Sequence, residues 1–504
     1  MNLQNLDLGL LEYDIINAFC LEIFLGWSTL FLLVWVLIIQ NRKDLGYLSL
    51  SSNAQWITVL IILLSLFICY FSNFTNFTWL PINAVLILDA LSFNARVITL
   101  VSCLLFFLIA SSFMKDHPTS VNELCCLILL SVISFIILIS VNDFLSLFLC
   151  IELQGLSFYV LACFRKSSDF SIEAGVKYFI TGAIASCMML FGISLIYGIT
   201  GTLSFEELKQ LMLCLSANQL SGITLDNSTT YVGLHLGILF LMAALLFKLG
   251  VAPLHFWLPD VYEGSPTNIT AFFALVPKVA LLVVIVRLLF DVFEPLQILW
   301  QPILLQVSIF SVIIGTVGAI YQRRIKRLLA YSTIGHNGFL VLALASVNQE
   351  GLNALIVYIT LYILTSACIF LFVLNVRERG TLIENPTFYE ACGIIKTNPL
   401  LGVCLALPLF SLAGIPPLVG FIAKYQMFLA AIQAEYILTS VILVVVSVIA
   451  CYYYIRFTKV HFFEGSQLIW NRTITRETSV CFSISCGLIF LLSLLPRFFS
   501  VFVF

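Results

Sequence analysis

Long apolar runs, separated by short polar segments, repeat along almost the whole chain. A run of about 20 residues crosses the hydrocarbon core of a bilayer as an α-helix, since each residue adds about 1.5 Å. The pattern predicts an all-α polytopic membrane protein with about fourteen transmembrane helices. The predicted spans are 16–40, 54–71, 84–113, 121–140, 142–163, 171–200, 229–262, 267–291, 302–321, 325–347, 351–376, 399–434, 437–459 and 478–497.

Two of these spans are too long for one straight crossing. Span 229–262 contains Pro253 and Pro259, and span 399–434 contains the adjacent Pro416 and Pro417. Because proline removes a helical hydrogen bond and clashes with the preceding turn, both spans are predicted to be discontinuous helices. Residues 202–217 predict a short amphipathic helix at the membrane surface.

Composition agrees with this pattern and narrows the chemistry. Hydrophobic residues make up 61% of the chain and charged residues 10%, against about 25% charged residues in soluble domains. The fifteen cysteines form no CxxC pair and no Cys/His metal spacing. The sequence also lacks the GxGxxG and GxxxxGKS/T phosphate-binding motifs. We therefore expect neither a metal nor a cofactor in this chain.

Lysine and arginine are distributed unevenly between the predicted loops. Of the basic residues that lie in loops, all but one are in the loops after spans 1, 3, 5, 9, 11 and 13. The opposite loops hold only Lys209. The positive-inside rule therefore predicts that both termini lie on the side opposite the basic loops. The first basic residue is Arg42, so we expect no cleaved signal or transit peptide.

Three lysines lie deep within predicted spans, where a charge costs several kcal/mol and needs protein or water around it. Lys278 is near the middle of its span and is interpreted as functional, with a static ion pair as the alternative. Lys424 follows the proline pair of span 12, and Lys248 precedes Pro253 in span 7. Broken helices form ion paths in transporters. The alternatives are a packed lysine beside a kink for Lys424 and a snorkelling lysine for Lys248.

Acidic residues supply candidate partners for two lysines. Glu152, near the middle of span 5, is the predicted partner of Lys248, and a protonated glutamate hydrogen-bonded to a neighbour is its alternative. Lys177 lies four residues after Glu173, which is the spacing of a helical ion pair. Functional and purely structural roles both stay open for Lys177.

The remaining polar groups within the spans are two histidines and one further acid–base pair. His336 stands near Asn337 and two hydroxyl residues that could hold water, and His255 lies in the break of span 7. A neutral imidazole both accepts and donates a proton, so both are candidate relays, and satisfied packing residues are the alternative. Asp89 and Arg96 are seven residues apart in span 3 and predict a structural pair.

Glu152, Lys177, Lys248, Lys278, His336 and Lys424, with His255 as a weaker candidate, form a sparse series of titratable groups. No nucleophile–base triad accompanies them in the sequence. Proton movement is the chemistry that these residues support.

Five segments make the chain resemble a known family. They are IELQGLSFYVLA (151–162), EAGVKYFITGA (173–183), FKLGVAPLHFWLPDVYEGSPT (247–267), YSTIGHNGF (331–339) and GIPPLVGFIAKY (414–425). In combination they resemble the antiporter-like membrane subunits of respiratory complex I, over almost the whole chain. The resemblance implies three N-terminal helices (1–113), two inverted repeats of spans 4–8 (121–291) and 9–13 (302–459), and a C-terminal helix (478–504).

The resemblance also assigns residues. The family's span 5 glutamate falls on Glu152, and its lysines of spans 7, 8 and 12 fall on Lys248, Lys278 and Lys424. Lys177 matches a lysine common in span 6 of one such subunit. Another subunit of the family usually has glutamate where this chain has Lys424, and a third continues into a long lateral helix that we do not expect here.

The function implied is that of a non-redox, proton-translocating subunit of NADH:ubiquinone oxidoreductase. NADH, flavin, iron–sulfur clusters and ubiquinone are then expected in other subunits. The expected partners are other membrane-arm subunits, including neighbouring antiporter-like ones, and lipids, but no nucleic acid. The alternatives are a subunit of a multi-subunit Na⁺/H⁺ antiporter and a purely structural membrane spacer.

The 44 phenylalanines suggest an AT-rich organelle genome. We therefore expect a multi-pass protein of the mitochondrial inner membrane, encoded in the organelle, with basic loops in the matrix and both termini in the intermembrane space. A bacterial plasma membrane is the alternative.

Overall fold

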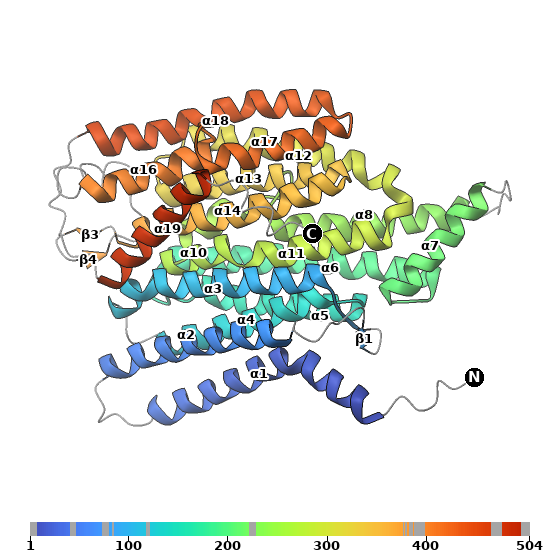
Figure 1. Ribbon diagram of the computed structural model, residues 1–504, viewed down its shortest axis with the longest axis horizontal. Helices are drawn as coiled ribbons and strands as arrows, with labels where there is room; N and C mark the ends of the chain where they lie inside the picture. The colour runs from blue at the N-terminus through green and yellow to red at the C-terminus, as the bar shows by residue number, and fades with distance from the viewer. Residues whose placement is uncertain are drawn as a thin grey trace.

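The computed structural model describes residues 8–40, 47–72, 80–82, 85–116, 121–220, 228–375, 377–378, 381–382, 387, 399–464 and 476–494. Most of them are helical. Figure 1 shows the helices side by side in one bundle, with α1 (Leu8–Gln40) along the bottom of the view and α18 (Ile437–Phe463) along the top.

Each of the fourteen predicted spans has a helical counterpart. In the described ranges, twelve segments are long and apolar enough to cross a membrane, and the shorter apolar helices Gly402–Ala413 and Thr478–Leu494 belong to spans 12 and 14. The other unbroken helices are α2 (Tyr47–Ser72), α3 (Ala90–Asp116), α4 (Val121–Ser140), α5 (Phe144–Ala162), α6 (Asp169–Thr200), α12 (Gln297–Ile320), α13 (Ile325–Ser346), α14 (Gln349–Leu374) and α19 (Arg476–Leu494).

Short elements lie at the two ends of the bundle. α7 (Phe205–Leu220) confirms the predicted helix at 202–217 and projects from one end in Figure 1. The strands β1 (Leu80–Ile82) and β2 (Leu86–Leu88) pair antiparallel, with Leu80 opposite Leu88. The strands β3 (Arg377–Glu378) and β4 (Thr381–Leu382) form a second small hairpin at the opposite end of the bundle (Figure 1).

Both predicted breaks are present. α8 (Ser228–Leu249) is followed by α9 (Trp257–Gly264), and α16 (Pro399–Ala413) is followed by α17 (Val419–Gln433). The two over-long spans are therefore discontinuous helices, as the proline clusters predicted.

The two breaks begin with the same helix cap. Gly250 and Gly414 follow the last helical residues with φ values of +73° and +84°, a region that favours glycine. The next N–H group, from Val251 or Ile415, donates to a carbonyl five residues earlier, at 3.2 Å in both cases. This is the six-to-one bond of a Schellman cap. Prolines then prevent the helix from continuing.

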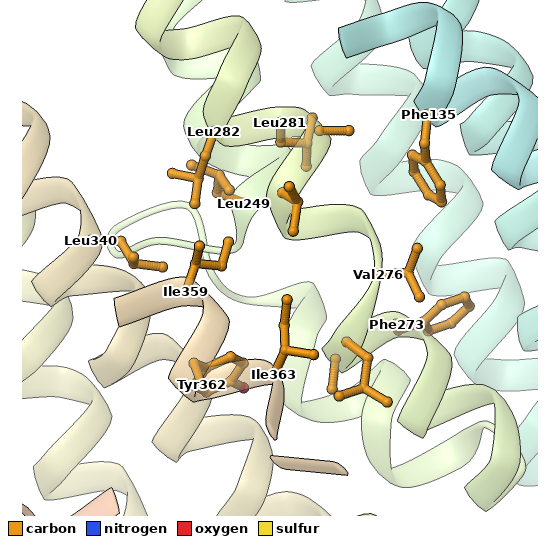
Figure 2. Packing of buried hydrophobic residues seen from close by; sticks show 14 of the residues in the cluster. Phe135, Leu249, Phe273, Val276, Leu281, Leu282, Leu340, Ile359, Tyr362 and Ile363 are labelled. Carbon is orange, nitrogen blue, oxygen red and sulfur yellow. The ribbon is translucent and has the colours of Figure 1, made fainter. Parts of the chain in front are cut away.

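Span 8 contains a third interruption that the sequence analysis did not predict. α10 (Thr267–Leu275) gives way at Pro277 to α11 (Pro277–Val286), and a π-helical turn η2 (Arg287–Val292) and a 3₁₀ turn η3 (Glu294–Leu296) follow. The most apolar stretch of this span is completely buried. Leu282 of α11 and Ile359 of α14 line the same apolar hollow, and Figure 2 shows both among the buried side chains.

The outer helices present apolar side chains outward. Leu149 on α5, Ile184 on α6 and Val448 on α18 are all exposed on the bundle surface. An apolar exterior around a buried centre is the arrangement that a lipid environment requires.

The predicted structural pair of Asp89 with Arg96 is wrong. Arg96 instead donates to Glu22 of α1 at 2.5 Å, and Arg287 donates to Asp89 at 2.7 Å. Residues seven apart on a helix share a face but are separated by about 10 Å along its axis. Each charge therefore pairs with a closer group on a neighbouring helix. Asp89 also accepts the N–H of Ser92, which caps the start of α3.

We expect Glu22→Gln to destabilise the packing of α1 on α3. Arg96 would keep its charge in a buried site after losing its partner, which costs about 3–5 kcal/mol. The measurement is the melting temperature of the detergent-solubilised preparation, with Glu350→Gln at an exposed position of α14 as the control. Equal melting temperatures for the two variants would contradict a stabilising role for the pair.

Candidate functional site

Lys278 lies at the centre of the bundle, in the first turn of α11. It is 4% exposed, and its Nζ has no hydrogen-bond partner in the described part of the chain. Its described contact is the ring of Tyr362 on α14, whose centroid is 3.9 Å from Nζ. A ring face attracts an ammonium but offers it no acceptor. The static ion pair is not found, because no carboxylate of the described residues lies within 4 Å of Nζ.

His336 lies between two tyrosines. Its Nδ1 is 2.6 Å from the hydroxyl of Tyr358 on α14, and its Nε2 is 2.9 Å from the hydroxyl of Tyr454 on α18. In a neutral imidazole one nitrogen donates and the other accepts, so one tyrosine accepts and the other donates. Exchange of the tautomer reverses both hydrogen bonds. The arrangement therefore suits a proton relay and orients the ring.

Lys424 is held by backbone carbonyls that the break in span 12 leaves free. Its Nζ donates to the carbonyl oxygens of Leu412 and Ala413, both at 2.9 Å. These residues end α16, where helical carbonyls lack intrahelical partners and carry partial negative charge. The side chain is 6% exposed. The break thus creates the binding site for the ammonium. The alternative of a lysine that only packs beside a kink does not account for these two hydrogen bonds.

A small cavity lies between His336 and Lys424. Its volume is about 20 Å³, and Tyr358, Tyr362 and Thr365 also line it. A polar cavity of about 10–15 Å³ or more holds one water molecule. The cavity is therefore large enough for a water that bridges the imidazole side to the ammonium side.

Lys248 lies in the last turn of α8, beside the other break. Its Nζ donates to the hydroxyl of Tyr159 on α5 at 3.5 Å. Glu152 is close enough for its charge to act on Lys248, and its Oε1 is buried without a hydrogen-bond partner. Among the described residues no ion pair shorter than 4 Å joins the two. The predicted partners are thus neighbours that are not in contact.

Helix α13 connects the first break to the buried histidine. Asn337 donates from Nδ2 to the carbonyl of Leu249 at 2.6 Å, where α8 ends. The hydroxyls of Ser332 and Thr333 donate to backbone carbonyls of their own helix. Asn337 therefore acts as a cap for the broken helix, a role that the sequence analysis had not assigned to it.

The remaining two candidates lie apart from this buried group. Lys177 is 46% exposed and pairs with Glu173 at 2.8 Å and with Asp260 at 2.9 Å. The helical Glu173–Lys177 pair is confirmed. His255 has its Nδ1 3.2 Å from the carbonyl of Pro253 and stacks on the ring of Phe256. No hydrogen bond between described residues joins Lys177 or His255 to Lys278, His336 or Lys424.

Two groups of residues at the site were missed by the sequence analysis. Tyr358, Tyr362 and Tyr454 contact the titratable side chains, but within apolar runs they are indistinguishable from packing residues. The i, i+4 spacing of Tyr358 and Tyr362 on one helix face is the signal that was available. Glu263 was also missed; it binds Arg324 and, at 3.0 Å, Arg327.

Buried titratable groups beside two broken helices define an antiporter-like membrane protein. The family described as NADH:quinone oxidoreductase/Mrp antiporter matches residues 141–450. The chain belongs to this family.

Its relatives agree with the resemblance seen in the sequence motifs. The chain is 36% identical to NADH-ubiquinone oxidoreductase chain 2 of Marchantia polymorpha, over 96% of both chains. It is 42% identical to NADH-quinone oxidoreductase subunit N 1 of Rhizobium meliloti, over 70% of both chains.

Solved structures share the fold. A chain of respiratory complex I from Thermus thermophilus superposes with a TM-score of 0.75 at 25% identity, with 95% of this chain and 97% of that chain covered. A chain of the Mrp complex from Dietzia sp. superposes with a TM-score of 0.77 at 19% identity, with 95% and 94% covered. The second likeness concerns the fold alone.

Tyr454→Phe is expected to destabilise the protein through His336. The change leaves the Nε2 atom buried without a partner, which costs about 1–3 kcal/mol. Tyr452→Phe, on the exposed side of the same helix, is the matched control. Thermal unfolding of both variants measures the difference, and no difference would show that the hydrogen bond to Tyr454 does not contribute.

Proposed function

We propose that this chain is the proton-translocating membrane subunit that its relatives name chain 2 or subunit N of NADH:quinone oxidoreductase. Electron transfer from NADH to quinone takes place in other subunits, and this chain holds no redox cofactor. The observation that carries the proposal is Lys278, a lysine that is 4% exposed and whose ammonium has no acceptor among the described residues. Burying an ionisable group within a membrane costs free energy, so such a group is interpreted as functional by default.

The second half of the chain supplies the later steps of the proposed path. A proton leaves Lys278 and reaches His336, whose ring is 5.4 Å from that of Tyr362, the residue beneath the lysine. The two tyrosine hydroxyls hold the imidazole in either tautomer. A water in the small cavity then passes the proton to Lys424.

The first half supplies the proposed switch. A signal from the rest of the complex changes the separation of Glu152 and Lys248. When Glu152 moves away, the protonated form of Lys248 loses stabilisation and its proton moves towards Lys278. The absence of a direct contact between Glu152 and Lys248 is compatible with a pair that forms and separates. Lys177, with its two carboxylates, and His255 are assigned supporting roles in the first half.

The wider assignments of the proposal rest on the family and the charge pattern. We place residues 121–291 and 302–459 as two inverted repeats, each with one broken helix. Other membrane-arm subunits and lipids are the proposed partners. The proposed location is the mitochondrial inner membrane, with basic loops in the matrix and both termini in the intermembrane space; a bacterial plasma membrane is the alternative.

Lys278→Met is expected to slow proton transfer through this chain by about 10²-fold or more, because it removes the central proton carrier. Proton pumping per NADH oxidised, measured on the assembled complex in sealed vesicles, is the test. Lys459→Met, at an exposed position of α18, is the matched control. If the Lys278 variant is fully assembled and pumps as the control does, the central role of this lysine is wrong.

The Na⁺/H⁺ antiporter alternative is supported by the family match, because the description of the family includes the Mrp antiporter. It predicts Na⁺-dependent proton exchange in vesicles without NADH oxidation. Co-migration of the chain with a very large NADH-oxidising complex on native gels, with no such exchange, favours the proposed function. A purely structural spacer predicts instead that neutral replacements of the buried lysines change assembly but not turnover.

A further inference from the structure

A buried lysine at the basic end of the bundle has no part in the proposed path. Lys326, in the first turn of α13, is 2% exposed. Its Nζ donates to the carbonyl oxygen of Ser265, between α9 and α10, at 2.9 Å. Its neighbours Arg324 and Arg327 differ from it, because their side chains are 47% and 38% exposed and both bind Glu263. Of these three cations, Lys326 is the one withdrawn from the surface.

A large hollow brings space for water close to this lysine. Its volume is about 1100 Å³, and Arg165, Pro266 and Asn268 contribute to its walls. Pro266 follows Ser265 directly in the chain, and Arg165 is close enough for its charge to act on Lys326. This part of the hollow has polar groups and is large enough for water. Lys326 therefore lies next to a region from which it can take up a proton.

Polar side chains continue inwards from Lys326, along the contact between α9 and α13. The hydroxyl of Ser265 is buried and has no partner in the part of the chain that the structure describes. Tyr262 lies one turn earlier on α9, and its hydroxyl interacts with that of Thr333. Thr333 is two turns after Lys326 on α13, which places it about 10 Å further along the helix. These hydroxyls form a polar line through an otherwise apolar contact.

The polar line reaches the central lysine. Tyr262 is close enough to Tyr362 for a charge on one hydroxyl to act on the other. The ring of Tyr362 is the surface on which the ammonium of Lys278 lies, with its centroid 3.9 Å from Nζ. A hydroxyl group both donates and accepts hydrogen bonds. The hydroxyls along this line, with water between them, can therefore pass a proton towards Lys278.

We propose that Lys326 takes up protons from the basic side of the membrane and supplies them to Lys278. Its Nζ releases one proton towards the hydroxyl of Ser265 and regains one from water in the hollow. The released proton continues through the hydroxyls of Tyr262 and Thr333. Lys326 thus adds to the proposed function, on which this inference rests, the entrance that the path lacks.

An entrance at Lys278 agrees with the proposed switch in the first half of the chain. A proton that has reached Lys278 loads Lys248 while Glu152 is close, because the carboxylate favours the charged lysine. When Glu152 moves away, the proton returns to Lys278 and continues to His336.

A purely structural role for Lys326 is the alternative, since its hydrogen bond also holds the chain where α9 ends. Arginine separates the two roles. It keeps the positive charge and can donate to the Ser265 carbonyl, but it does not release its proton in a protein. A structural cap therefore tolerates Lys326→Arg, whereas a proton carrier does not.

The test measures protons pumped per NADH oxidised by the assembled complex in sealed vesicles. We expect Lys326→Arg to lose as many pumped protons as Lys278→Met, because both changes interrupt the same path. Lys459→Arg makes the same substitution at an exposed position of α18 and should pump as the parent does. Thr333→Val and Tyr262→Phe each remove one hydroxyl of the polar line and should show a loss in the same direction.

Two outcomes would overturn the proposal. One is a Lys326→Arg complex that is fully assembled and pumps as Lys459→Arg does, which would leave Lys326 as a structural cap. The other is normal pumping by both hydroxyl variants, and this outcome decides the matter even where arginine prevents assembly. If Lys278→Met is defective and Lys326→Arg is normal, only the entrance is wrong. Normal pumping by Lys278→Met instead contradicts the proposed function, whatever Lys326→Arg does.

Discussion

The structure depends on hydrogen bonds from side chains to the backbone carbonyls that a broken helix leaves without partners. A bilayer offers no water to unsatisfied carbonyls, so a break within it must supply its own donors. The chain does this twice, with different side chains. At the end of α8 the donor is the neutral amide of Asn337, and at the end of α16 it is the ammonium of Lys424. The same backbone geometry therefore supports a structural cap in one half and a titratable site in the other.

This difference makes the two halves chemically unequal. Lys424 is stabilised by fixed dipoles that cannot leave, because they belong to the backbone. Lys248 contacts a tyrosine hydroxyl and has a neighbouring carboxylate, Glu152, that it does not touch. A site held by side chains can be altered by small movements, whereas a site held by the backbone is steadier. That contrast fits a switch in the first half and a carrier in the second.

Local features made the spans and breaks predictable from the sequence. The length of an apolar run determines where a helix can cross the membrane. The glycine and the prolines that follow Leu249 and Ala413 end the helix locally, within a few residues of their own positions. The helices and both breaks were therefore found where expected. The buried lysines and His336 could be singled out because a charge in an apolar run is conspicuous without any knowledge of the fold.

Tertiary pairing was not predictable in this way. Asp89 and Arg96 share a helix face, yet each found a closer partner on another helix. The tyrosines around His336 come from α14 and α18, and Tyr454 lies more than a hundred residues after His336 in the chain. The break at Pro277 was missed because span 8 is short enough for one straight crossing, so its proline was not interpreted as a break.

The complete enclosure of span 8 has a consequence for how the protein is made. Its neighbours α13 and α14 follow it in the chain, and α14 supplies the ring that covers Lys278. During synthesis this span enters the bilayer before those helices exist. For that interval Lys278 must face lipid, the insertion machinery or another protein. The order of synthesis thus delays the enclosure of Lys278 until the second half has been inserted, so an incomplete chain cannot offer the proposed proton path.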